Sequence, residues 1–124
     1  MMSRDWQQDI IELMKAYGQE VKYRPELPSP EVLRLRAELI YEEMMETING
    51  MGFDYFDSEG LHTSEQLDVD IVKIADGIID SIVVLIGGAK AIGIDLSPLW
   101  DIVHENNMTK ASGPVREDGK KLKP

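Results

Sequence analysis

The chain has 124 residues, 43% of them hydrophobic, and a formal net charge of −10 at pH 7. A chain of this length can bury one hydrophobic core, so we expect a single domain over residues 1–124. The acidic charge argues against non-specific binding to nucleic acid or to an anionic membrane surface, because both would repel the protein. The sequence contains no cysteine, which excludes disulfides, zinc–thiolate sites and thiol nucleophiles.

The charge is unevenly distributed along the chain. Residues 1–108 carry 21 acidic and 8 basic side chains, whereas residues 109–124 carry 2 acidic and 5 basic ones. The N-terminal segment is charged from Arg4 onward and lacks the apolar block of a signal peptide. The most apolar run, residues 81–89, is too short to span a bilayer. We therefore expect a cytoplasmic protein with an acidic body, a basic tail and no membrane partner.

Hydrophobic periodicity predicts an all-α protein, because no segment shows the alternation that is typical of a strand. Ser29 followed by Pro30 is a typical helix start, and Ser97 followed by Pro98 repeats the pattern. Four helices are expected, over about residues 5–17, 30–49, 67–92 and 98–108. The predicted fold is four-helix-bundle-like, with two long central helices and two short flanking ones.

The third predicted helix is apolar on nearly all sides. Ile71, Ile74 and Ile78 begin one apolar face, and Val69 and Val72 begin the opposite one. A helix with this pattern is normally buried. Its three partners offer too little cover, so we expect self-association to complete the fold.

The second predicted helix changes from apolar to acidic along one of its faces. A sector that begins with Val32 and Leu39 continues as Glu43 and Glu46, and Glu42 lies at its edge. We expect these glutamates to point toward the interior of the bundle.

The third predicted helix carries two aspartates, Asp76 and Asp80, one turn apart within an apolar face. A buried carboxylate costs several kcal/mol unless it is paired with a base or binds a metal ion. Pairing with a base is the ordinary solution. The helices contain few candidates for it: Arg34, Arg36, Lys73 and Lys90.

This shortage of bases favours cations from solution. Clustered carboxylates suit Mg²⁺ or Mn²⁺, and zinc fits poorly because the chain has no cysteine and only two histidines. Carboxylate-bound Mg²⁺ suits phosphate chemistry, because it neutralises a polyphosphate and activates a water molecule. Basic residues of the tail, Lys120 among them, would then hold the phosphates of a nucleotide.

Several segments resemble a known superfamily. "EEMME" at residues 42–46 fits the first half of its pattern, E-E-x-x-E followed by E-x-x-D. The likeness extends over "YGQEVKYRPELPSPEVLRLRAELIYEEMME", "ADGIIDSIVVLIGGAKAIGIDLSPLWDIVHENNMTK" and "REDGKKLKP". The chain thus resembles the all-α nucleoside triphosphate pyrophosphohydrolase superfamily, in its MazG-like and phosphoribosyl-ATP pyrophosphohydrolase-like branch.

The resemblance implies a Mg²⁺-dependent enzyme with a MazG-type fold. Such an enzyme cleaves a nucleoside triphosphate between the α and β phosphates, releasing the monophosphate and pyrophosphate, and its role would be cleaning of the nucleotide pool. Members of these families are homodimers or dimers of dimers, with sites near the subunit interface.

The resemblance also implies roles for individual residues. Glu43 and Glu46 match metal ligands, and Glu42 matches the acid that helps to activate the water. Asp80 matches the aspartate of the second motif. Asn107 and Lys110 would lie near the nucleotide or its phosphates.

One position departs from the superfamily pattern. Gly77 stands three residues before Asp80, where the pattern requires glutamate. Asp76, one turn from Asp80, can supply the missing carboxylate. The departure also favours one alternative, a non-catalytic helical binding or regulatory protein with a structural cation site. A second alternative is another substrate of the superfamily, such as phosphoribosyl-ATP.

Overall fold

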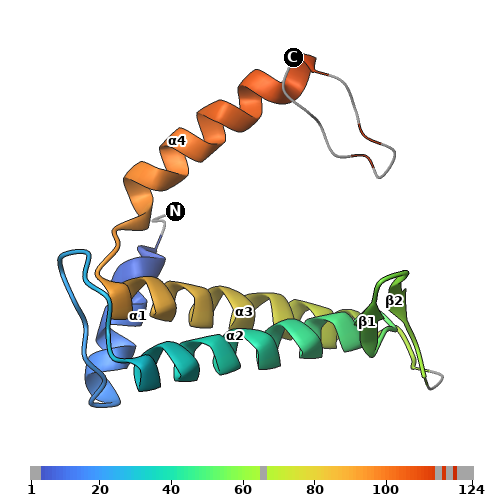
Figure 1. Ribbon diagram of the computed structural model, residues 1–124, viewed down its shortest axis with the longest axis horizontal. Coiled ribbons are helices and arrows are strands. Elements are labelled where there is room, and N and C mark those ends of the chain that lie inside the picture. Colours follow the sequence, from blue (N-terminus) through green and yellow to red (C-terminus); the bar gives the residue numbers. More distant parts are fainter. Residues whose placement is uncertain (1–3, 65–66, 114–115, 117–118, 120–124) are drawn as a thin grey trace. The chain divides into compact units, whose positions relative to one another are not determined.

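The computed structural model describes residues 4–64, 67–113, 116 and 119. These residues form four α-helices, a two-stranded hairpin and a short 3-10 turn (Figure 1). In chain order they are α1 (Trp6–Ala16), α2 (Pro30–Gly50), β1 (Tyr55–Asp57), β2 (Gly60–His62), α3 (Ile71–Ile92), α4 (Leu96–Thr109) and η1 (Lys110–Ser112). The predicted all-α architecture with two long central helices is confirmed.

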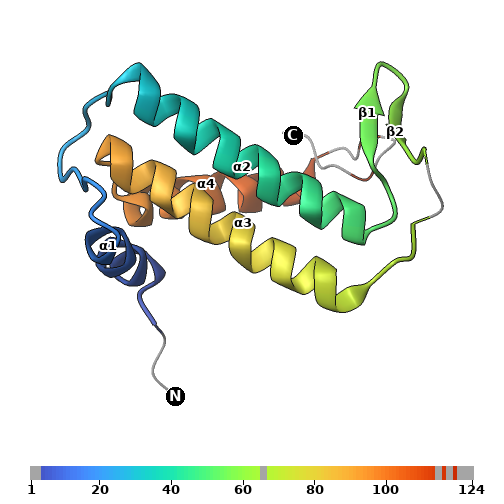
Figure 2. The ribbon, with the colours of Figure 1, turned by 90° about the horizontal axis from the view of Figure 1, so that it is seen from below.

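The chain divides into two compact units. The first, Met1–Ile94, contains α1, α2, the hairpin and α3, and the second, Asp95–Pro124, contains α4 and η1. Within the first unit, α2 and α3 lie side by side (Figures 1 and 2). The two figures also show α1 at one end of this pair and the hairpin at the other.

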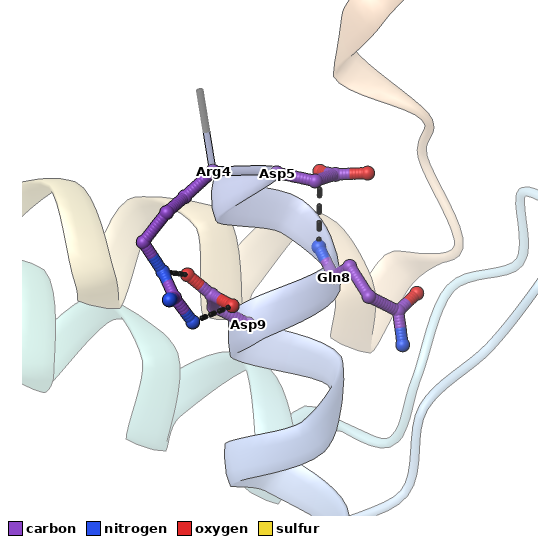
Figure 3. Close-up of polar contacts among 4 residues, drawn as sticks. All are labelled: Arg4, Asp5, Gln8 and Asp9. Atoms are coloured by element: carbon purple, nitrogen blue, oxygen red, sulfur yellow. Dashed lines mark hydrogen bonds and ion pairs between the residues drawn. The ribbon is translucent and has the colours of Figure 1, made fainter. Parts of the chain in front are cut away.

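The start of α1 is fixed by two side chains that bond within the first turn. The Asp5 carboxylate accepts a hydrogen bond from the Gln8 amide at 3.1 Å, and Arg4 pairs with Asp9 at 2.8 Å (Figure 3). The first contact caps a free amide of the helix, as aspartate does well at this position. The helix therefore begins at Trp6, within one residue of the predicted start.

The predicted start of α2 is confirmed, whereas that of α4 is wrong. Ser29 Oγ accepts a hydrogen bond from the Val32 amide at 3.3 Å, so Ser29 is the N-cap of α2. At α4 the cap is Asp95, whose carboxylate accepts a bond from the Ser97 amide at 3.0 Å. Asp95 precedes Ser97 in the chain and caps the free amides of the first turn. The helix therefore begins at Leu96, and Ser97 lies inside it.

The hairpin contradicts the prediction that the protein has no strands. It is antiparallel, with Tyr55 opposite His62 and Asp57 opposite Gly60. Tyr55 and His62 stack with ring centroids 5.0 Å apart, and His62 Nε2 lies 2.8 Å from Asp57 Oδ1. Strands of three residues are too short to show an alternating pattern, so sequence periodicity misses them.

The hydrophobic core of the described residues is small. Its buried apolar side chains are Ile10, Met14, Ile86, Ala89 and Ala91, which come from α1 and from the C-terminal half of α3. The N-terminal half of α3 is open by contrast, and Ile71 is 80% exposed. The prediction that α3 is buried on all sides is therefore wrong for the single chain, because its main helical partners within this unit, α2 and α1, leave part of its surface open.

Among the described residues, no single helix is long and apolar enough to cross a membrane. The pair α3 and α4, taken together across the break between them, passes the same test by length and composition alone.

Candidate metal-carboxylate site

The candidate site is a group of carboxylates on facing turns of α2 and α3. Glu43 of α2 is half-buried, whereas Glu42 and Glu46 on the same helix are exposed. Burial raises the pKa of the Glu43 carboxyl, and the negative charges of Glu46, Asp80 and Glu42 raise it further. The structure thus brings together four of the predicted residues, three from α2 and Asp80 from α3.

Glu43 has one oxygen that no protein group satisfies. Its Oε2 is buried and has no hydrogen-bond partner in the described part of the chain. A buried acceptor left without a donor costs about 1–3 kcal/mol, and more when it is charged. An oxygen in this position requires either a proton or a cation, and Mg²⁺ and Mn²⁺ are the ions that prefer carboxylate oxygens.

Three of the four bases that the sequence offers for this role make other contacts. Arg34 pairs with Glu38 at 3.0 Å. Arg36 donates to Gln19 Oε1 at 3.1 Å, and Lys90 donates to Gln7 Oε1 at 2.7 Å. Among the ion pairs of the described residues, none includes a carboxylate of the candidate site. The acids therefore remain available to a cation.

The acids are less buried than the sequence predicts. Glu42, Glu46, Asp76 and Asp80 are all exposed, because α2 and α3 form one layer with an open face. Asp76 is absent from the charges that shift the Glu43 pKa, so Asp80 is the nearer aspartate. Within the described residues, no three acidic or histidine side chains converge closely enough to hold a metal ion as they stand. Binding would require exposed carboxylates to rotate toward Glu43.

Gly77 has a packing role at a close contact between α2 and α3. It is buried, and a Cβ added there would lie 2.8 Å from Thr47 Cα and still closer to Thr47 Oγ1. The glutamate of the superfamily pattern cannot be accommodated at this backbone distance without moving the helices apart. The departure from E-x-x-D therefore has a structural cause within this chain.

Two residues that sequence reasoning missed lie between the acids. Thr47 Oγ1 donates to the Glu43 carbonyl at 2.8 Å and lies 3.4 Å from Ser81 Oγ. Thr47, Ser81 and Gly77 form a contact of small residues. This contact sets the distance between α2 and α3 beside Glu43 and Asp80. The sequence did contain a signal for this helix contact. Gly77 and Ser81 are two small residues four positions apart, so they lie on the same face of α3.

The three predicted nucleotide-binding residues lie outside this unit. Asn107 is exposed on α4, and Lys110 is half-buried in η1. Both belong to the second compact unit. Lys120 lies outside the described residues. Their roles stay predictions.

Comparison with known protein families gives one match. The profile of the phosphoribosyl-ATP pyrophosphohydrolase family matches residues 10–107, from the first buried residue of α1 into α4. No curated protein matches the chain. Because the family match covers well over half of the sequence, the chain belongs to the phosphoribosyl-ATP pyrophosphohydrolase family of the MazG-like superfamily and is a nucleotide pyrophosphohydrolase, acting on phosphoric anhydrides.

Proposed function

We propose that the protein is a Mg²⁺-dependent nucleoside triphosphate pyrophosphohydrolase. It cleaves a (d)NTP between the α and β phosphates, releases the monophosphate and pyrophosphate, and so cleans the nucleotide pool of the cytoplasm. The observation that supports this most is the buried Glu43 oxygen, which lacks a donor and lies among three further carboxylates. Such a group suits a hydrolase of phosphoric anhydrides, because the polyphosphate substrate of such an enzyme binds together with a cation that carboxylates can hold.

Each carboxylate has a proposed role. Glu43, Glu46 and Asp80 would hold the cation, and Asp76 would join them by rotating from the adjacent turn of α3. When bound, Mg²⁺, or Mn²⁺ in its place, would supply neutralisation of the phosphate charge and activation of water. Glu42, exposed at the edge of the site, would accept the proton of the attacking water.

The nucleotide is held by residues of the last helix and of the basic tail. Asn107 and Lys110 contact the nucleotide or its phosphates, and Lys120 adds positive charge to the leaving pyrophosphate. A cationic group near the departing phosphates stabilises the charge that develops on them.

The protein works as a homodimer or a dimer of dimers in this proposal. The support is α3, which exposes large apolar residues over more than half of its length: Ile71, Val72, Ile78, Ile79 and Leu85. A monomer rarely leaves so many bulky side chains in water along one element. A second copy would cover them and enclose the acids between the subunits.

The family name offers a second candidate for the substrate, phosphoribosyl-ATP. It carries the same triphosphate, so the same acids would act on it. A non-catalytic protein with a structural cation site is the other alternative. The close contact at Gly77 weakens it, because packing accounts for the residue that favoured it.

A substrate panel separates these candidates. The purified protein would be incubated with each (d)NTP and with phosphoribosyl-ATP, with and without Mg²⁺, and the products separated by ion-exchange chromatography. We expect monophosphate and pyrophosphate from at least one (d)NTP. Turnover of phosphoribosyl-ATP alone would support the second candidate. No turnover of any substrate, with a melting temperature that Mg²⁺ leaves unchanged, would overturn the hydrolase proposal.

A further inference from the structure

Arg36 is a buried cation without a negatively charged partner in the described residues. Its side chain lies on α2 and the residue is only 9% exposed. The guanidinium donates from Nη2 to the neutral Gln19 Oε1 at 3.1 Å, and its buried Nε has no hydrogen-bond partner. A buried charge with this little compensation is strongly unfavourable, so an anion is expected beside it.

The fold holds the guanidinium in a defined place. Gly87 of α3 lies opposite, and a Cβ added there would come within 2.8 Å of Arg36 Nη1. The backbone of Gln19 is held in place, because its main-chain N–H donates to the Met14 carbonyl at 2.9 Å. Arg36 is therefore packed against bare helix backbone and donates to the side chain of a residue whose backbone is anchored.

A cavity of about 120 Å³ opens beside Arg36. Gln19, Glu20 and Lys22 line it together with the apolar Val32 and Leu35. This volume exceeds what a single water needs and is sufficient for a small oxyanion.

Lys22 is the second cation of the cavity, and its side chain is only 15% exposed. Its Nζ lies 3.0 Å from Glu20 Oε1 and 3.7 Å from Glu26 Oε2. Both glutamates are largely exposed and neutralise Lys22 from the solvent side. They leave the charge of Arg36 uncompensated.

We propose that this cavity is a phosphate-binding site in which Arg36, supported by Lys22, donates hydrogen bonds to the phosphate oxygens. A planar guanidinium carries several donors, and paired N–H donors suit phosphate in a geometry that a halide cannot use. Arg36 lies seven residues before Glu43, about 10 Å along α2. The site is therefore distinct from the carboxylates, and it does not depend on hydrolysis. Free inorganic phosphate and the phosphate of a nucleotide share this chemistry.

Calorimetric titration of the full chain tests the proposal. The probes are inorganic phosphate and, separately, a nucleoside monophosphate, both in metal-free buffer with ionic strength held constant by sodium chloride. We expect saturable binding of at least one probe, weakened about tenfold or more in Arg36→Gln through loss of charge-assisted hydrogen bonds. Binding of both probes identifies a site for free phosphate, whereas binding of the nucleotide alone identifies a subsite for its phosphate.

Arg34→Gln is the matched control, because Arg34 lies on the same helix, is exposed and already pairs with Glu38. It should bind the probes as the unchanged protein does. A non-specific effect of phosphate as a salt would be the same in all variants and would count against a site at Arg36. Absence of saturable binding by the unchanged protein, or equal affinity in Arg36→Gln, overturns the proposal.

Gly87→Ala decides the matter if Arg36→Gln does not fold. The added methyl displaces the end of a flexible side chain rather than backbone, and alanine favours a helix more than glycine does. We expect an unchanged circular dichroism spectrum with weaker phosphate binding. A folded Gly87→Ala protein with undiminished affinity would also contradict the assignment.

Discussion

The two ends of α3 differ in what covers them. At the end near α1, residues 86–91 are all buried, and Ile10 and Met14 of α1 complete the small core. We call this part the covered half. At the other end, residues 71–80 are mostly exposed although they are at least as apolar, and they carry Asp76 and Asp80. We call this part the open half.

The difference separates stability from function within one helix. The covered half buries apolar area and so supplies folding free energy to the single chain. The open half keeps large apolar side chains in water, which is unfavourable unless a second copy covers them, and it leaves its carboxylates accessible to a cation. Substitutions in the two halves should therefore change different measurements.

The largest effect on stability is expected in the covered half. Met14 is 2% exposed, so Met14→Ala leaves a cavity and should reduce the free energy of unfolding by about 2–5 kcal/mol. Met44→Ala removes the same atoms from a residue that is 44% exposed and should have much less effect. Chemical denaturation measures both. Equal losses would contradict the placement of the core.

Gly77, at the contact between α2 and α3, should be the next most sensitive position. Gly77→Ala places a Cβ 2.8 Å from Thr47 Cα, and overpacking of this kind costs about 1–3 kcal/mol. Gly88→Ala is the control, because its nearest neighbour would be Ile40 Cδ1 at 4.0 Å. Helix propensity should make that variant neutral or slightly more stable. A stabilised Gly77→Ala would remove the packing explanation for the altered motif.

A smaller effect is expected at Glu43, with opposite signs in the absence and presence of Mg²⁺. The raised pKa of Glu43 means that its ionised form is disfavoured in the folded protein, so Glu43→Gln should raise the melting temperature in metal-free buffer. The same variant should lose the increase that Mg²⁺ produces in the unchanged protein. Glu38→Gln, an exposed change on the same helix, should keep that increase. If Glu43→Gln lowered the melting temperature in metal-free buffer, the result would contradict repulsion between Glu43 and the neighbouring carboxylates.

The pH dependence of this cation effect follows from the same shift. A proton competes with Mg²⁺ for the Glu43 carboxylate, and the raised pKa moves this competition above the usual range of glutamate. Stabilisation by Mg²⁺ should therefore be greatest where Glu43 is ionised and should fade as the pH falls through its raised pKa. Thermal melts at a series of pH values measure it, and a Mg²⁺ effect that persists at acidic pH would place the ion elsewhere.

The smallest effect on the single chain is expected at the apolar surface of the open half. Ile79 is 54% exposed, so Ile79→Ser should change the free energy of unfolding of a monomer by only about 0.5 kcal/mol. It should nevertheless weaken self-association, because the residue would be buried between two copies. Light scattering after size-exclusion chromatography measures the oligomeric state. Unchanged assembly of the variant would exclude this part of α3 from the interface.

The sequence predicted the helices and the proximity of the acids, because both depend on periodicity along one chain. Projection of the two helices placed Glu43 and Asp80 on inward faces, and in the structure the negative charge of Asp80 contributes to the raised pKa of Glu43. The prediction of burial was wrong, because a projection shows which residues share a face and says nothing about what covers that face. The acids and Ile71 proved exposed for this reason.

Other features depended on contacts that no single element contains. Gly77 looked like a lost ligand, and only the approach of Thr47 from α2 explains it. The hairpin at Tyr55 and the cap at Asp95 were missed because each rests on one or two local bonds rather than a repeated pattern.

The most direct test of the proposed site is phosphorus-31 NMR of a reacting (d)NTP with Mg²⁺. For the unchanged protein and for Glu38→Gln we predict signals of the monophosphate and pyrophosphate. For Glu43→Gln the rate should fall about a hundredfold or more, since a metal-binding or proton-transfer carboxylate commonly contributes this much. Release of orthophosphate with a diphosphate, or full activity in Glu43→Gln, would contradict the account.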